Sequence, residues 1–360
     1  MTTEFAVTTS NLSSSHGHGE GAPIFYAENV FVAIMNLLIF FIGSIGNFGV
    51  ILAVLFCRKL QTTTNVFVFS LSCADLITSL FLFWLAVARL SPSFGWPWPR
   101  AYWLCKVSAY LVFTCFGVSV YNLAAISVNR LILITRPNIY TKIYTRFNIA
   151  VMISITWLLP LVVGAALPLA GIGGFGYDHR DHTCSDLDNL PTAHLFSLAH
   201  TIVGLPVPLL VLTFSYARIY IHVRRHFGKQ LRQQKEMSVS VTMNGSTVCT
   251  VPSAACERRQ AQIIQQQLEI TKNLFTVFII FVIIIAPFFI FNLFPQNSPV
   301  SYRINLYLSV PFLANSAINP LIYAARHPQF KGVLRLMMLC KYREIPEQTA
   351  FLQRFTKTLN

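Results

Sequence analysis

The chain has 360 residues, of which 54% are hydrophobic and only 11% are charged. Soluble domains usually carry about a quarter charged residues, so this composition excludes a soluble enzyme, a disordered chain and a small secreted module held by disulfides. The 27 basic and 13 acidic residues give a net charge of +14. Whether this excess marks a nucleic-acid-binding surface depends on where the basic residues lie.

Long segments with almost no charge dominate the sequence. A helix needs about 20 mostly apolar residues to cross a bilayer. Seven segments meet this length with at most one charged residue each: 29–57, 60–88, 107–129, 147–177, 189–217, 273–302 and 304–325. The turn-forming residues Gln296-Asn297-Ser298-Pro299 separate the last two helices. The sequence therefore predicts an all-α membrane protein, a seven-transmembrane helix bundle.

The distribution of lysine and arginine predicts the orientation. Of the 27 basic residues, 22 fall on the side that holds the first, third and fifth loops and the C-terminus. The positive-inside rule places that side in the cytosol and the N-terminus outside, as in a multi-pass plasma-membrane protein. The basic excess then reflects topology and contact with anionic membrane lipids, and we expect no nucleic-acid partner.

The chain divides into an extracellular tail over 1–27, the bundle over 28–326 and a C-terminal region over 327–360. The third cytosolic loop is expected at about 226–260. Asn11 begins an Asn-Leu-Ser glycosylation sequon in the outer tail, although such triplets also arise by chance.

The C-terminal region is predicted to begin with a short amphipathic eighth helix at the membrane surface. Its apolar residues have helical spacing, which places them on one face: Phe330, Val333, Leu334 and Met337. Cys340 follows at the end of this helix and is a candidate for palmitoylation. The alternative is an unmodified thiol.

Cys105 and Cys184 are the two of the eight cysteines that lie where an oxidising compartment can join them. Cys105 precedes the third helix, and Cys184 lies in the second outer loop. A disulfide between them would hold that loop over the helix bundle. The alternative is a pair of free thiols.

Asp75 is the only acid inside any predicted span. An intramembrane carboxylate is costly and is expected to face a partner or a watery cavity. Its candidate partners are polar residues of the first, third and seventh helices: Asn47, Ser119, Asn315, Ser316 and Asn319. The side-chain oxygen atoms of these residues suit a metal site for a small hard cation such as Na⁺, and Asp75 would supply the negative charge. A neutral hydrogen-bonded network is the equal alternative.

Motifs in six of the seven spans, with Cys105 before the third, resemble those of one known family. They occur in this order: Gly46-Asn47, Leu71-Ser72-Cys73-Ala74-Asp75-Leu76, Cys105 with Arg130 further along the third helix, Trp157, Pro208 with Tyr216, Pro287, and Asn319-Pro320-Leu321-Ile322-Tyr323. The chain resembles a rhodopsin-like (class A) G-protein-coupled receptor over residues 28–340. Within that family it is similar to the melatonin-receptor-like and the moody and trapped-in-endoderm-like group, in which Asn-Arg replaces Asp-Arg.

This resemblance implies roles for several residues. Arg130, Tyr216 and Tyr323, with Pro320, would rearrange to open a cytosolic cavity for a heterotrimeric G protein and for arrestin. The polar residues around Asp75 would hold an allosteric Na⁺, and no other cofactor is implied. A packing switch between ligand and G protein would consist of Val120, Pro208, Phe281, Ile285 and Pro287.

Three positions depart from the family pattern. Asn129 replaces the usual acid before Arg130, and Gln267 stands at the expected ionic position of the sixth helix. The usual Cys-Trp-x-Pro is Ile284-Ile285-Ala286-Pro287, so the aromatic toggle is absent. These departures favour a receptor with basal activity, and the trigger of its switch must differ.

The residues expected to line a ligand pocket are mostly apolar. They are Val112, Phe113, Phe116, Phe288 and Phe289, with the polar residues His200, Asn292, Asn305 and Ser309. Val112 stands where amine receptors carry an acid, so the sequence disfavours monoamines, and a small apolar or lipid-like ligand is expected. Arg89 and Arg303 lie near the outer rim, where they either attract a carboxylate or mark the membrane interface.

Other functional classes have less support. A transporter or channel needs internal repeats or a line of polar residues through the bundle, and neither is visible. No metal cluster and no nucleophile–base pair marks an enzyme. A ligand-independent, constitutively active receptor remains an alternative to a ligand-activated one.

Overall fold

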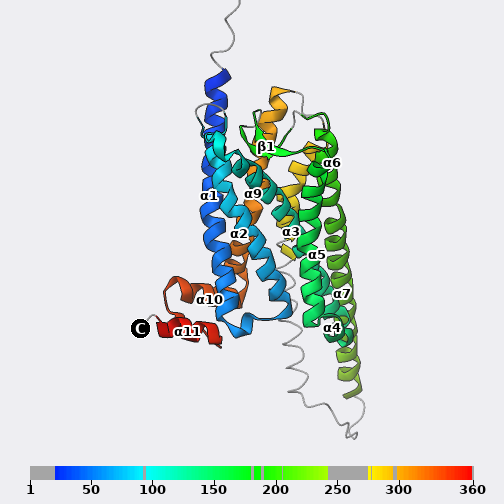
Figure 1. Ribbon diagram of the computed structural model, residues 1–360. Coiled ribbons are helices and arrows are strands. Elements are labelled where there is room, and N and C mark those ends of the chain that lie inside the picture. The colour runs from blue at the N-terminus through cyan, green and yellow to red at the C-terminus, as the bar shows by residue number, and fades with distance from the viewer. Residues whose placement is uncertain are drawn as a thin grey trace, which may run out of the picture.

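Long helices lie side by side in a bundle in the computed structural model (Figure 1). The structure describes residues 21–91, 95–179, 182–187, 190–204, 206–241, 275–276, 278–294 and 298–358. The helices of the bundle are α1 (Gly21–Phe56), α2 (Thr63–Arg89), α3 (Tyr102–Thr135), α5 (Arg146–Leu169), α6 (Ala193–Gly204) followed by α7 (Pro206–Val241), the helix Phe278–Asn292, and α9 (Pro299–Arg326).

Short elements connect or follow these helices. They are η1 (Arg58–Leu60), η2 (Pro99–Ala101), α4 (Pro137–Ile143), β1 (Phe175–Asp178), β2 (Thr183–Asp186), α10 (Pro328–Met338), η3 (Tyr342–Glu344) and α11 (Ala350–Thr358). The β1–β2 hairpin lies at one end of the bundle and α10 and α11 at the other (Figure 1). We call these the disulfide end and the α10 end.

The outward faces of the helices are apolar. Five helices in the described part of the chain are long and apolar enough to cross a membrane. Ile45 is 73% exposed and Leu169 87% exposed, although both are large apolar residues. A soluble protein rarely exposes broad apolar surfaces, whereas a lipid-facing helix does.

Local sequence sets several helix ends. The side chains of Thr62, Thr145 and Ser298 accept hydrogen bonds from backbone N–H groups in the first turns of α2, α5 and α9. Such caps satisfy donors that a helix start leaves unpaired. Ser298 lies in the predicted turn before the seventh helix, and that helix begins at Pro299, where proline fits because its missing N–H has no helical partner.

The charge-free segment 147–177 does not form one helix, so its predicted extent is wrong. The helix α5 ends at Leu169. Gly171 and Gly173 follow with φ angles of 77° and 66°, a left-handed conformation that breaks a helix and suits glycine. The chain then enters β1 at Phe175.

Two predicted boundaries also shift. The helix α1 begins at Gly21, inside the tail expected over 1–27. The helix α7 continues to Val241, well into the loop expected at about 226–260. Helix-favouring lysine, glutamine, arginine and glutamate residues dominate the end of α7, which explains its extension.

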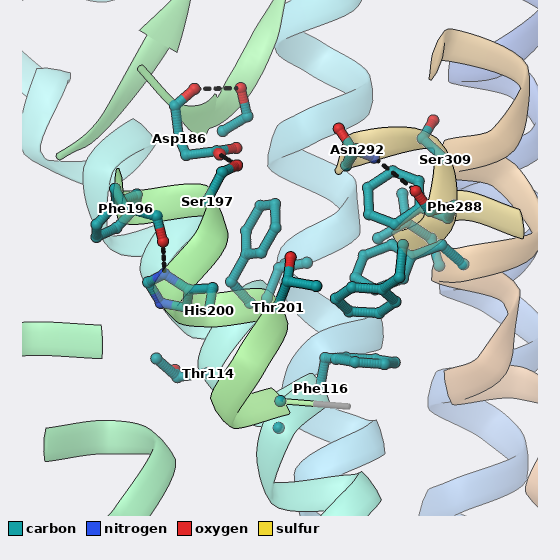
Figure 2. A pocket seen from close by; sticks show the side chains of 18 of the residues that line it. Thr114, Phe116, Asp186, Phe196, Ser197, His200, Thr201, Phe288, Asn292 and Ser309 are labelled. Atoms are coloured by element: carbon teal, nitrogen blue, oxygen red, sulfur yellow. Dashed lines mark hydrogen bonds between the residues drawn. The ribbon is translucent and has the colours of Figure 1, made fainter. Parts of the chain in front are cut away.

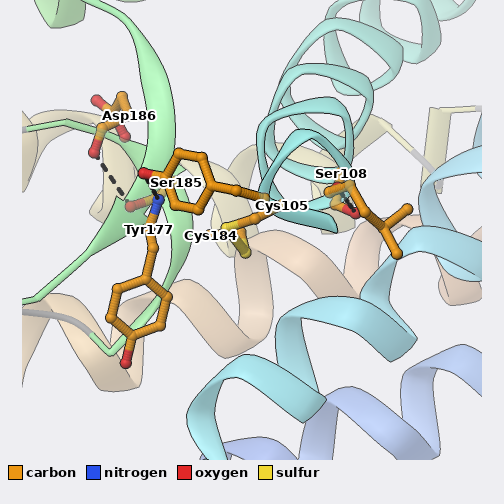
Figure 3. Close-up of a disulfide and its surroundings, with 8 residues drawn as sticks. Cys105, Ser108, Tyr177, Cys184, Ser185 and Asp186 are labelled. Atoms are coloured by element: carbon orange, nitrogen blue, oxygen red, sulfur yellow. Dashed lines mark hydrogen bonds between the residues drawn. A yellow bond between two sulfur atoms is a disulfide. The ribbon is translucent and has the colours of Figure 1, made fainter. Parts of the chain in front are cut away.

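The β1–β2 hairpin is fixed to the start of α3. The strands are antiparallel, with Tyr177 opposite Cys184. Cys184 forms a disulfide with Cys105, and their Cα atoms are 5.3 Å apart (Figure 3). The backbone N–H of Tyr177 also donates to the hydroxyl of Tyr102, 3.1 Å away. The predicted disulfide is confirmed, and it holds the hairpin across the disulfide end.

The predicted amphipathic helix is present as α10. Phe330 and Val333 are buried, and the ring of Phe330 stacks on Tyr323 of α9 at 5.6 Å. Cys340 is exposed just after this helix.

The region after α10 returns to the end of α1 instead of forming a free tail. The backbone N–H of Thr349 donates to the carbonyl of Phe56 at 3.0 Å, and that of Arg58 donates to Glu347 at 2.8 Å. Leu352 of α11 is completely buried.

Loss of either Cys105 or Cys184 is expected to destabilise the receptor. A disulfide that closes a loop of this length contributes about 2–5 kcal/mol, because it restricts the unfolded chain. We expect Cys105→Ser, Cys184→Ser and the double variant to lower the thermal midpoint of purified receptor by the same amount. Additive losses in the double variant would show that the two cysteines act independently.

Candidate functional site

A cavity of about 370 Å³ opens between the helices near the disulfide end. Its walls come from α2, α3, α5, both strands of the hairpin, α6, the helix Phe278–Asn292 and α9. All nine side chains predicted for the pocket line it: Val112, Phe113, Phe116, His200, Phe288, Phe289, Asn292, Asn305 and Ser309. Cavities of about 300–1,000 Å³ are typical of small-molecule sites.

Aromatic rings form the deep wall of this cavity. We call Phe113, Phe116, Phe288, Phe289 and Phe312 the aromatic floor. Phe312 lies at its centre, with ring centroids 4.5 Å from Phe116 and 4.4 Å from Phe288. Phe312 is missing from the predicted set, although it lies one helical turn after Ser309 on the same face of α9.

Polar side chains stand around the aromatic floor. Figure 2 shows Asp186, Ser197 and His200 on one side of the cavity and Asn292 and Ser309 on the other. The amide of Asn292 donates to the carbonyl of Phe288 at 2.8 Å and to the side chain of Asn305 at 3.2 Å. The hydroxyl of Ser309 donates to the carbonyl of Leu306 at 2.7 Å. These groups are held in place before any ligand binds.

Sequence reasoning missed the acid of the hairpin. Asp186 lines the cavity and accepts a hydrogen bond from Ser197, 3.2 Å away. Burial raises the pKa of Asp186 above its ordinary value. The sequence could have indicated Asp186, because it lies two residues after Cys184 on β2, and the disulfide of Cys184 holds this strand over the cavity.

The two arginines expected near the rim have different positions. Arg89 is buried, lines the cavity and donates to the side chain of Asn29 at 3.1 Å. Arg303 is exposed and forms an ion pair with Glu28, with two donor–acceptor distances of 3.0 Å. Arg303 therefore joins α9 to α1 outside the cavity.

Asp75 lies in a buried cluster below the aromatic floor. The hydroxyl of Ser119 donates to one carboxylate oxygen at 2.5 Å, and the amide of Asn319 donates to the other at 2.8 Å. Asn47 donates to the backbone carbonyl of Ser316 at 2.7 Å. The structure thus brings α1, α2, α3 and α9 together through the polar residues that the sequence singled out.

The space beside Asp75 fits one small cation. A cavity of about 10 Å³ is lined by Asp75, Thr78, Asn315 and Ser316. The Thr78 hydroxyl is buried there with no hydrogen-bond partner among the described residues. A space of about 10–15 Å³ holds one water-sized species, and oxygen ligands suit hard cations. Asp75 and the neighbouring oxygens would hold Na⁺, which would supply positive charge to the cluster.

Asn129 is held by neutral hydrogen bonds at the other end of α3. Its side-chain oxygen accepts from Thr64 of α2 at 2.6 Å, and its amide donates to the hydroxyl of Tyr140 at 3.1 Å. The adjacent Arg130 is only 6% exposed. Gln267 lies outside the described residues.

Tyr216 and Tyr323 are buried at the same end. Tyr216 packs against Phe278, with ring centroids 5.6 Å apart. The Tyr323 hydroxyl is buried and has no hydrogen-bond partner in the part of the chain that the structure describes. Pro320 lies inside α9, and a Cβ on Gly46 would come within 2.7 Å of its ring, so glycine permits this close approach of α1 and α9.

Four residues of the predicted packing switch, Val120, Phe281, Ile285 and Pro287, lie on α3 and on the helix Phe278–Asn292. Phe281 stacks on Phe116 at a centroid distance of 6.4 Å and an interplanar angle of 8°. Val120 and Ile285 are fully buried. Pro287 lies within the helix Phe278–Asn292.

Pro208 lies in α7, two residues after Pro206. The apolar span that contains it runs from Ala193 to Arg225.

Comparisons with known proteins agree with these features. A family model described as "7 transmembrane receptor (rhodopsin family)" matches residues 46–323. The chain is 28% identical over 359 residues to the G-protein coupled receptor moody of Drosophila melanogaster, which covers 86% of this chain and 51% of that protein. It is 28% identical over 304 residues to human melatonin receptor type 1B. This match covers 83% of this chain and 75% of the melatonin receptor. The chain thus spans about half the length of the moody receptors that it matches.

A solved structure shows the same fold. The crystal structure of squid rhodopsin superposes with a TM-score of 0.69 at 20% identity, covering 98% of this chain and 96% of the squid chain. The predicted resemblance is confirmed, because the family model spans the bundle from Gly46 to Tyr323. The chain belongs to the rhodopsin family of seven-transmembrane receptors.

Proposed function

We propose that this protein is a G-protein-coupled receptor of the plasma membrane. A small ligand binds in the cavity at the disulfide end, and a heterotrimeric G protein binds at the α10 end around Arg130. The basic residues gather at the α10 end, which supports a cytosolic location for that end and an extracellular N-terminus. Arrestin would use the same end. The family membership gives no support to a transporter or channel.

The observation that carries this proposal is the position of Phe116. Its ring belongs to the aromatic floor of the cavity and also stacks on Phe281. Phe281 lies one turn after Phe278, which packs against Tyr216. A ligand that moves Phe116 therefore acts through packed rings on the helix beside Arg130. Ligand and G protein would favour the same bundle state, so each would raise the affinity for the other.

Constitutive signalling is the second candidate, and Asn129 favours it. An acid at this position would pair with Arg130 and restrain it, whereas Asn129 makes neutral bonds to Thr64 and Tyr140. The inactive state lacks this ionic contact, and even a solvent-exposed pair would contribute about 0.5–1 kcal/mol. Since about 1.4 kcal/mol changes an equilibrium tenfold, this loss raises the active fraction several-fold.

We expect measurable basal G-protein activation that Asn129→Asp lowers several-fold. The structure accommodates the change, because the Tyr140 hydroxyl can donate to a carboxylate. Adding Gln267→Glu is expected to lower activation further, and Arg130→Ala is expected to abolish it without emptying the cell surface. The measurement is G-protein activation per surface receptor. A silent unmodified receptor, or stronger signalling by Asn129→Asp, would show that other contacts hold the inactive state.

Sodium is expected to reduce basal activation through the cluster around Asp75. An ion there needs a compensating anion, because the surroundings are apolar and an amide supplies only a dipole. We expect sodium chloride to lower activation relative to the large cation N-methylglucamine, and Asp75→Asn to remove this difference while the receptor still folds. An unchanged sodium effect in Asp75→Asn would leave Asp75 with a structural role only.

Cys340 is proposed as a palmitoylation site, because it is exposed at the end of α10. An acyl chain there would add a second anchor beside the amphipathic face. Acyl-exchange labelling is expected to fall to background in Cys340→Ser. Undiminished labelling would remove this proposal. Asn11, proposed for glycosylation, lies outside the described residues.

A further inference from the structure

The hairpin supplies the cavity with an acid that no described cation neutralises. Asp186 is the last residue of β2 and lines the cavity. Its side chain accepts from the hydroxyl of Ser197 on α6 at 3.2 Å. Within the described ranges, neither ion pair of the structure includes Asp186.

The positive charge of the cavity acts on other residues. Arg89 and Asp178 both line the cavity, and both influence the pKa of His182. Burial lowers the pKa of His182, and the charge of Arg89 lowers it further. The charge of Asp178 raises it. The same two residues act in opposite directions on the pKa of Tyr177, which burial raises to about 12. For Asp186, burial raises the pKa and Asp178 adds a smaller increase.

His200 adds a hydrogen-bond acceptor to the same side of the cavity. Its Nδ1 atom lies 3.1 Å from the carbonyl oxygen of Phe196. A carbonyl only accepts, so Nδ1 must carry the proton and Nε2 is the acceptor of a neutral imidazole. Nε2 is buried and has no partner among the residues described. Figure 2 shows His200 on the same side of the cavity as Asp186 and Ser197, with Phe288 on the other side.

The cavity therefore has two chemically different parts. One is the aromatic floor around Phe312. The other is an acceptor-rich wall that comprises Asp186 and His200. A carboxylate surrounded by protein atoms is strongly stabilised by a cation that also donates hydrogen bonds. An anionic ligand such as a fatty acid would meet repulsion there instead.

We propose that the ligand is a small amine whose protonated nitrogen binds Asp186 and whose apolar or aromatic body contacts the aromatic floor. This inference rests on the proposed function, since it concerns the ligand of the same cavity. It differs from the expectation drawn from Val112. The acid absent from α3 is supplied by the hairpin, across the cavity, and the disulfide at Cys184 holds it in position.

Charged thiol reagents test whether Asp186 makes the electrostatic potential in the cavity negative, and they require no known ligand. Ala193 lines the cavity four residues before Ser197, on the same face of α6, so Ala193→Cys places a thiol close to Asp186. The probes are the aminoethyl and sulfonatoethyl methanethiosulfonates, which differ in the sign of their charge. The ratio of their two reaction rates cancels any change in the reactivity of the thiol itself. The labelling rates are measured in the intact receptor. The receptor without the Ala193→Cys change serves as the background control.

We expect Asp186→Asn, added to Ala193→Cys, to lower the cation-to-anion rate ratio at the introduced thiol by about tenfold, the factor that corresponds to about 1.4 kcal/mol. Asp186→Glu keeps the charge and is expected to keep the ratio. Asp178→Asn is the matched control, because it removes a carboxylate on the Arg89 side of the same cavity and is expected to change the ratio less. A ratio that Asp186→Asn leaves unchanged, or that Asp178→Asn lowers equally, would overturn the proposal.

Protection of the introduced thiol tests the ligand class itself. The probes are 2-(1-naphthyl)ethylamine and the neutral 2-(1-naphthyl)ethanol, which share one aromatic body. We expect the amine to protect at a concentration about tenfold lower, and this advantage to disappear in Asp186→Asn. Equal protection by both probes, or protection by neither, would count against an amine ligand. Labelling requires no G protein, so a receptor with this preference that activates no G protein would contradict the proposed function alone.

Discussion

The structure depends on the burial of α3 through the middle of the bundle. This helix packs against α2, α5, α7 and the hairpin. In a membrane interior, a buried polar group without a partner is costly, so each polar position on α3 requires a defined neighbour. Cys105 is joined to the hairpin, Ser119 donates to Asp75, and Asn129 bonds to Thr64 and Tyr140. One helix therefore connects the cavity, the buried carboxylate and the Arg130 end.

The contact that transmits movement between the two ends is apolar. The family's tryptophan toggle is absent, and its position is the fully buried Ile285. Phe281 lies one turn before Ile285, and its stack on Phe116 joins α3 to the helix Phe278–Asn292. Close-packed cores change between discrete arrangements instead of deforming smoothly. We therefore expect repacking at Phe116 to favour one position of the helix that packs against Tyr216.

Much of this arrangement is predictable from the sequence, for identifiable reasons. Charge-free length locates the spans, and an acid inside a span, such as Asp75, requires partners whose residue types are few. The resemblance to the family identifies part of the cavity wall. What the sequence does not show depends on backbone conformation and on distant contacts. The end of α5 follows from the left-handed Gly171 and Gly173, and the role of Asp186 follows from the path of the hairpin after Cys184. The docking of α11 on α1 depends on backbone hydrogen bonds that carry no side-chain signature.

The most direct measurement is a double-mutant cycle on basal G-protein activation per surface receptor, with Phe116→Ala, Phe281→Ala and both together. If the two rings transmit movement as one unit, each single change alters activation and the double variant resembles either single one. Matched thermal midpoints of the purified variants would separate this result from a general loss of folding. Independent, additive effects of the two changes, or activation that neither change alters, would contradict coupling between the cavity and the Arg130 end through this stack.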